Sequence, residues 1–232
     1  MGSASRSPRL KISPYHTYNM KLNRIFLAAL LLALGLFLYF MFFDQETNSS
    51  NGSVPVADTT AYNQEIRTER IEKDEFMRTN ADSPIADKPA FTGLLYYGPD
   101  PAYRVTARLE PFADKTQKLI VRMSDGTEEV YSKVAHAVFS LGGSTHRLLI
   151  VSIGDTYSIL FRDATSNKET YGGGRYLDLD ADQLTGSRTM LDFNTAYNPY
   201  CAYNPGYACP IPPAENVLDV SIKAGERYVP HE

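Results

Sequence analysis

The sequence has few of the residues that bind metals and no surplus of positive charge beyond its N-terminal region. It has two cysteines and four histidines in 232 residues. Two thiols without a nearby Cys or His pair supply only half of a tetrahedral zinc site, so we expect no metal and no cofactor. After residue 43 the chain carries 18 basic and 27 acidic residues. An acidic domain without a basic stripe repels phosphate backbones, which argues against nucleic acid as a partner.

Motifs that bind phosphate and calcium are incomplete as well. The triple glycine Gly172-Gly173-Gly174 forms neither the G-x-G-x-x-G pattern nor a P-loop, and we interpret it as a bulge that lets neighbouring tyrosines pack closely. The acidic run at residues 178–182 begins like an EF-hand loop, but Gln183 and Thr189 replace the required glycine and glutamate. We interpret this run as a solvated acidic turn, with a looser calcium site as the alternative.

A long uncharged segment lies near the N-terminus. Residues 25–43 are nineteen consecutive uncharged residues, about the length of a helix that crosses a roughly 30 Å hydrocarbon core. Basic residues precede this segment and acidic residues follow it. The positive-inside rule then makes residues 1–24 a cytoplasmic tail and places the domain outside the cytoplasm. A cleaved signal peptide is the alternative, although no small-x-small cleavage pattern follows. Either Met1 or Met20 can be the true start.

A linker and a helix are predicted next. Residues 44–60 are polar and rich in turn formers, so they predict a flexible linker. Residues 61–79 are rich in Glu, Arg, Lys and Gln without Gly or Pro, which favours a helix with a patchy apolar side. We expect its charges to form a solvated face and the helix to lie across one end of the domain, which spans residues 61–232.

From residue 91 to residue 162 the apolar residues alternate with polar ones, and turn signals recur at short intervals. Connections as short as Gly142-Gly143 require antiparallel pairing. The pattern predicts a mainly β domain, a meander of about seven strands, with further strands at 174–178, 189–193 and 217–222. About ten antiparallel strands could close into a barrel or split into a two-sheet sandwich.

The stretch from Glu169 to Asn216 is rich in Gly, Pro, Asn and Tyr and contains both cysteines. Such a composition predicts ordered loops, where binding sites tend to lie. Cys201 and Cys209 are separated by seven residues, and in an oxidising compartment this spacing favours a disulfide. A reactive Cys201 with His136 or His146 as base is the alternative.

The same stretch supplies polar groups among aromatic rings, which is what a small polar ligand needs. We predict that the ligand-binding residues are Glu169, Tyr171, Arg175, Tyr176, Asp192, Asn194, Tyr197, Asn198, Glu215 and Asn216. Arg175 is the natural centre, because its guanidinium can hold a carboxylate in two parallel hydrogen bonds. The alternative is that these side chains fasten the loops to the sheet by bonding backbone groups.

A set of short motifs runs from residue 99 to residue 226. It comprises PDPAYR at 99–104, DATS at 163–166, ETYGGGRY at 169–176, DFN at 192–194, AYNPYCAY at 196–203, Cys209-Pro210, Pro213, Glu215-Asn216 and AGE at 224–226. With these motifs the chain resembles the domain of unknown function 1684 family of bacteria and archaea, from about residue 65 onward. The family has no established activity, so the resemblance implies relatedness and no chemistry. Its members include membrane-attached or secreted proteins, which implies the same compartment here.

The sequence therefore predicts a membrane-anchored, extracytoplasmic β domain that binds a small polar or envelope ligand without catalysis. Two alternatives remain open. One is a hydrolase that uses paired carboxylates or Cys201, and the other is a structural envelope protein. A pocket beside Arg175 would favour a site, whereas full mutual bonding of the polar side chains would favour a scaffold.

Overall fold

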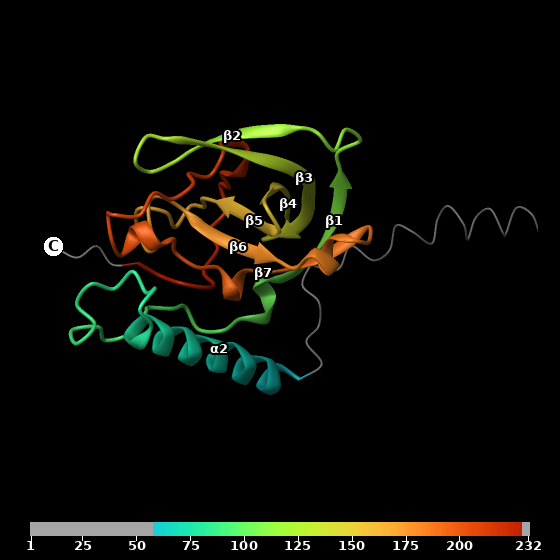
Figure 1. Cartoon of the computed structure of the whole chain (residues 1–232). Coiled ribbons are helices and arrows are strands. Elements are labelled where there is room, and N and C mark those ends of the chain that lie inside the picture. Colours follow the sequence, from blue (N-terminus) through green and yellow to red (C-terminus); the bar gives the residue numbers. More distant parts are fainter. Residues whose placement is uncertain (1–57, 229–232) are drawn as a thin grey trace, which may run out of the picture. The chain divides into compact units, whose positions relative to one another are not determined.

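A computed structural model describes residues 58–228 of the chain (Figure 1). The predicted tail, the predicted membrane segment at 25–43 and nearly all of the predicted linker lie outside the described residues. Within 58–228 no helix is both long and apolar enough to cross a membrane.

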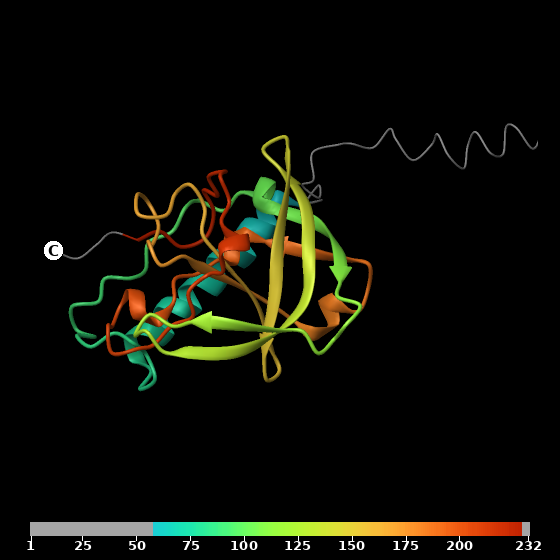
Figure 2. The same cartoon turned by 90° about the horizontal axis from the view of Figure 1, so that it is seen from above.

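The domain is built on one antiparallel sheet. Its strands are β1 (Arg104–Pro111), β2 (Lys118–Arg122), β3 (Glu128–Leu141), β4 (Ser144–Ile153), β5 (Thr156–Phe161), β6 (Arg175–Leu179) and β7 (Arg188–Asp192). The strand order is β6-β5-β4-β3-β1-β7, and β2 pairs with β3 off this path. The sheet curls into a half-barrel, as the view from above shows (Figure 2). The prediction of a mainly antiparallel β domain is thus confirmed, whereas neither a closed barrel nor a two-sheet sandwich forms.

The long strand β3 accounts for the curl. Its first residues pair with β2, and its later residues pair with β1. Its register with β4 shifts between Lys133 and Ala135, and such a bulge bends a strand and increases its twist. The turn from β3 to β4 is the predicted Gly142-Gly143, and both residues have positive φ, as a tight hairpin turn requires.

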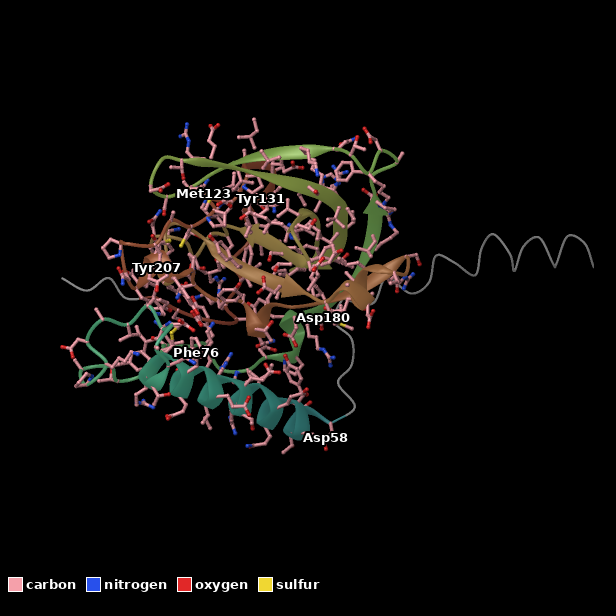
Figure 3. All side chains as sticks on the ribbon, viewed as in Figure 1. Asp58, Phe76, Met123, Tyr131, Asp180 and Tyr207 are labelled. Carbon is pink, nitrogen blue, oxygen red and sulfur yellow. The ribbon has the colours of Figure 1, made fainter. Side chains whose placement is uncertain are left out.

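Alternating residues of the strands face two separate apolar clusters. In β4, Leu148 and Ile150 belong to the larger cluster, whereas Leu149 and Val151 belong to the smaller one. Because successive side chains of a strand point to opposite faces, the two clusters lie on the two sides of the sheet. Tyr131 of the smaller cluster lies on the side of the domain far from the helix (Figure 3).

Five short 3₁₀ turns punctuate the connections, at Pro101–Tyr103, Ala181–Leu184, Phe193–Thr195, Tyr200–Ala202 and Ala214–Asn216. The predicted strand at 217–222 does not form, and only Val217 makes an isolated parallel bridge, to Arg162. This part of the prediction was wrong: three backbone hydrogen bonds join residues 216–220 to residues 162–164, and beyond them side chains bond to Ile222.

The single α-helix of the described residues is α2 (Thr59–Thr79). The Asp58 carboxylate caps it by accepting hydrogen bonds from the N–H groups of Thr60 and Ala61. Tyr62, Ile66 and Met77 are buried, and they share one face of the helix. The helix runs along one side of the domain (Figure 1). The expectation that its charges are all solvated was wrong, because two cations on that face also bond to the domain.

Candidate functional site

Arg175 is the largest of the almost fully buried side chains of the predicted site, with 1% of its surface exposed. Its guanidinium donates to the carbonyl oxygens of Ile222 (2.9 Å), Ala224 and Glu226 (3.2 Å). It also donates to the Asp163 carboxylate at 3.4 Å. Burial lowers the pKa of Arg175, and the Asp163 carboxylate opposes this shift. Arg175 therefore fastens residues 222–226 to the start of β6. Both terminal nitrogens of its guanidinium are already hydrogen-bonded within the domain, and the buried Nε–H has no partner among the described residues.

Asp192 and Asn194 join the helix and an early loop to the end of β7. The Tyr62 hydroxyl of α2 donates to the Asp192 carboxylate at 2.8 Å. The Asn194 side chain accepts from the Asp100 N–H at 2.9 Å and donates to the Asp100 carbonyl at 2.8 Å. Arg70 of the helix donates to the Asn194 carbonyl at 3.2 Å. These contacts connect three segments that are distant in the sequence.

Two further asparagines are fully buried. The Asn216 amide donates to the carbonyls of Leu149 (2.9 Å) and Leu160 (2.8 Å) and accepts from the Leu149 N–H (2.6 Å). The Asn198 amide donates to the Tyr203 hydroxyl and the Arg227 carbonyl, both at 3.0 Å. The Asn216 side chain thus bonds only to the backbone, and the Asn198 side chain bonds once to the backbone and once to a hydroxyl. Both fit the fastening alternative.

Glu226 was missed in the sequence prediction, although its motif was noted. Its carboxylate, 1% exposed, accepts from the Asn198 N–H at 2.8 Å and from the Tyr203 hydroxyl at 2.9 Å. Lys73 of α2 makes an ion pair with it at 2.6 Å. The preceding Gly225 has φ of +74°, and a Cβ there would lie 2.4 Å from the Ala196 carbonyl oxygen. That close approach explains why the residue is a glycine. In the sequence, the glycine beside Glu226 was the available signal.

Tyr176 and Tyr197 pack edge to face, with ring centroids 5.8 Å apart. The Tyr176 hydroxyl donates to the Pro210 carbonyl, and the Tyr197 hydroxyl donates to the Asp178 carboxylate at 2.8 Å. Burial raises the pKa of both phenols, so they remain neutral donors. Their contacts hold the late loop against β6.

Glu215 belongs to a different group of residues. Its carboxylate accepts from His136 Nε2 at 2.8 Å and lies 3.6 Å from the Lys133 ammonium. Arg147 donates to His136 Nδ1 at 2.8 Å, which requires the Nε2-protonated, neutral imidazole. Burial opposes the shift, but these partners lower the pKa of Glu215. Glu215 forms no side-chain hydrogen bond or ion pair with any of the other nine predicted site residues.

Glu169 and Tyr171 lie on the loop that follows β5. The Glu169 carboxylate accepts from the Tyr97 hydroxyl at 3.2 Å and pairs with Lys223 at 3.3 Å, and about a third of the side chain is exposed. Tyr171 lines a hollow of about 340 Å³, together with Asn167, Lys168, Thr170, Gly172, Gly173 and Tyr228. A Cβ on Gly173 would lie 2.4 Å from the Tyr171 ring, so the triple glycine does permit close packing of Tyr171.

A second hollow, of about 450 Å³, lies next to the C-terminal residues 227–228. Its lining includes Phe91, Leu94, Tyr203, Arg227 and Tyr228. Tyr228 lines both hollows, and its ring packs edge to face on Tyr171 at a centroid distance of 5.2 Å. The sequence prediction missed Tyr228 and the segment 85–95, since neither stands in the stretch rich in Asn and Tyr.

Cys201 and Cys209 are both free thiols in this structure, so the predicted disulfide is not formed in it. The Cys201 N–H donates to the Cys209 sulfur at 3.1 Å. The two cysteines are therefore neighbours in space, and their oxidation to a disulfide stays a prediction.

The described histidines do not support a cysteine–histidine pair. His136 bonds to Glu215 and Arg147, and His146 bonds to the Leu141 carbonyl at 3.1 Å. Neither histidine contacts a cysteine in residues 58–228. That part of the chain also holds no group of three or more His, Cys, Asp and Glu side chains placed to bind a metal.

Comparison with known proteins places these features in a family. The family model described as "Protein of unknown function (DUF1684)" matches residues 89–227. The solution NMR structure of an uncharacterised protein from Haloarcula marismortui is similar, with a TM-score of 0.59 and 36% sequence identity. That similarity covers 74% of this chain and 96% of the archaeal one. No curated protein matches the chain.

Proposed function

Because the chain belongs to the DUF1684 family, which is described only as being of unknown function, we propose a function from the site itself. The domain binds a small polar ligand without catalysis, and it does so at the two hollows that meet at Tyr228. We further propose that residues 25–43 anchor the chain in a membrane and that the domain works outside the cytoplasm.

The observation that carries this proposal is the pair of adjoining hollows. Their volumes, about 450 and 340 Å³, fall within the range of small-molecule sites. Both are walled by aromatic rings with a few polar groups, and Tyr228 is common to them. Rings remove ligand surface from water while polar groups fix orientation.

Charge at the hollows indicates the ligand class. Lys168 stands at the smaller hollow and Arg227 at the larger one, and both side chains are exposed. Arg227 also stacks over the Tyr97 ring at 5.4 Å, which orients its guanidinium. Asp87 is the single acid that lines either hollow. A ligand with a carboxylate or phosphate group and an apolar part suits this lining best.

In this proposal the predicted site residues take two roles. Tyr171 lines the ligand site and Glu169 lies beside it, whereas Arg175, Asp192, Asn194, Asn198 and Asn216 hold the loops that carry it. The scaffold alternative, a structural envelope protein, is favoured by this dense bonding. For a hydrolase that uses Cys201, neither described histidine contacts that thiol. A hydrolase that uses paired carboxylates stays an alternative.

The proposal can be tested by NMR titration of the full-length chain with benzoate and with phenyl phosphate. We expect saturable shifts of resonances from residues 85–95 and 167–173, because both probes combine a ring with an anion. Tyr228→Ala should weaken binding about tenfold or more, which corresponds to about 1.4 kcal/mol of lost ring contact. Tyr207→Ala, which removes an exposed ring outside the hollows, should leave it unchanged.

Shifts that do not saturate, or that survive Tyr228→Ala unchanged, would remove the proposed site. The scaffold alternative would then be preferred. A circular-dichroism melt of each variant separates lost binding from lost folding.

A further inference from the structure

The two cysteines are held in an asymmetric pair. Cys209 is buried, with 7% exposed, and Ser124 holds it from both sides. The Cys209 N–H donates to the Ser124 hydroxyl at 3.0 Å, and the Ser124 N–H donates to the Cys209 carbonyl at 2.8 Å. Cys201 is only partly buried and stands in the 3₁₀ turn Tyr200–Ala202. One thiol of the pair is therefore fixed in the interior, and the other is nearer to solvent.

The hydrogen bonds distinguish the two thiols chemically. The neighbouring Cys209 thiol lowers the pKa of Cys201, and a hydrogen bond from the Tyr171 hydroxyl at 3.9 Å acts in the same direction against burial. The same pairing, together with burial, raises the pKa of Cys209. The thiolate is the nucleophile in thiol chemistry, so the more exposed cysteine is also the more reactive one.

Tyr171 connects this pair to the surface. Its hydroxyl donates to Cys201, and its side chain lines the hollow of about 340 Å³. A molecule seated in that hollow would lie against the hydrogen-bond partner of the reactive sulfur. The pair is thus placed beside a cavity rather than sealed in the core.

We infer that Cys201 and Cys209 form a reversible thiol–disulfide couple that exchanges with disulfides of small molecules or peptides. The Cys201 thiolate attacks one sulfur of an external disulfide, which releases one thiolate and leaves a mixed disulfide at Cys201. Cys209 then loses its proton and attacks the Cys201 sulfur, which releases the second thiolate. The chain is oxidised by two electrons, the external disulfide is reduced to two thiols, and the reverse sequence restores both cysteines.

This inference is independent of the proposed ligand binding, since it requires no affinity for an anionic ligand. It also differs from a static structural disulfide in two respects. It assigns separate roles to the two sulfurs, and it requires that folded protein be reduced and reoxidised.

The roles can be tested with oxidised glutathione and the full-length chain, read by intact mass. In Cys209→Ser the second step is blocked, so Cys201 should accumulate as the mixed disulfide with glutathione. Cys201→Ser should be modified at least about tenfold more slowly, because the remaining Cys209 sulfur is buried and glutathione reaches it poorly. Equal rates in the two variants, or no mixed disulfide in Cys209→Ser, would overturn the inference.

Two measurements guard against misfolded variants. In the unmodified chain, glutathione buffers of increasing oxidation should convert two free thiols into an intramolecular disulfide reversibly, with an unchanged circular-dichroism spectrum. A disulfide that resists reduction until the protein unfolds would contradict a working couple. Tyr171→Phe keeps the ring and removes the hydroxyl, so the pH profile of iodoacetamide alkylation at Cys201 should move to higher pH. An unmoved profile would exclude the hydroxyl as a positioning group.

Discussion

Arg175 has the side chain of an anion-binding residue, but its hydrogen bonds are made within its own chain. A guanidinium carries five N–H donors in a rigid fork. Here the two terminal nitrogens meet three backbone carbonyls and the Asp163 carboxylate, whereas the buried Nε–H has no partner among the described residues. The carbonyls belong to residues 222–226, which form no strand. One side chain thus supplies bonds that a strand ladder would otherwise provide.

Arg175→Lys is therefore expected to destabilise the domain rather than to affect ligand binding. A lysine ammonium keeps the charge but cannot reach all four oxygens, so at least one buried oxygen loses its donor at a cost of about 1–3 kcal/mol. Urea denaturation should show this loss, while the exposed Arg122→Lys on β2 should change stability by less than about 0.5 kcal/mol. A stable Arg175→Lys protein that fails to bind the probes would instead return Arg175 to the ligand site.

At the scale of single residues, the sequence identified polar side chains that matter to the fold, but it did not identify their hydrogen-bond partners. Arg175, Asn194, Asn198 and Asn216 were singled out because polar side chains cluster in one loop-rich stretch, and all four are buried and bonded. Whether a guanidinium meets a ligand or a carbonyl depends on chain segments about fifty residues away. The periodicity and composition of a sequence describe residues that are close along the chain, so they do not indicate such distant partners.

At the scale of secondary structure, the side chain of Asn216 takes the place of a missing stretch of sheet. β4 and β5 pair from Ile153↔Thr156, next to their hairpin turn, as far as Val151↔Ser158, and beyond that pair they separate. Continuing that register would pair Leu149 with Leu160. The Asn216 amide bonds to backbone groups of both residues instead. An amide side chain offers the same donor and acceptor as a peptide group, so it can stand between two diverging strands.

Replacing Asn216 by Ala should cost about 3 kcal/mol or more. The substitution leaves one N–H and two carbonyls in a buried position, and each unsatisfied group costs about 1–3 kcal/mol. Asn204→Ala is the control, because that amide lies in a partly exposed loop, donates to the Pro84 carbonyl and accepts from the Gly206 N–H, groups that water can reach. Its expected cost is about 1 kcal/mol. If urea denaturation gave the two variants the same stability, Asn216 would not bridge the strands.

Elements formed by local signals were predictable, whereas segments held by long-range bonds were not. The tight hairpin turn and the alternation of apolar and polar residues along β1 are local signals. The turn formed at the predicted Gly142-Gly143, and β1 formed within the predicted β region. The segment 217–222 has strand-like residues but only one backbone bridge. Its backbone bonds to residues 162–164 end at Val220, and the Arg175 side chain holds Ile222 instead. Its apolar pattern records burial, since Leu218 and Ile222 are both in the core.

The whole molecule combines a described domain with an N-terminal region whose role rests on sequence alone. The curl of the sheet could not be predicted, because it depends on a bulge in β3 and on the sharing of that strand between β1 and β2. The predicted orientation depends on simpler physics. Five basic residues and no acidic ones precede residues 25–43, and basic residues beside a membrane helix favour the cytoplasmic side.

We therefore expect protease added to intact cells, or to spheroplasts where an outer membrane is present, to digest the domain while a cytoplasmic marker protein stays intact. An epitope at the N-terminus should remain with the membrane fraction, because nineteen uncharged residues are long enough to span the bilayer and no cleavage pattern follows them. Release of a shortened, soluble domain would show a cleaved signal peptide instead. Protection of the domain until the inner membrane is opened would reverse the predicted topology, and the cysteine pair would then lie in a reducing compartment, where free thiols rather than a disulfide are the resting state.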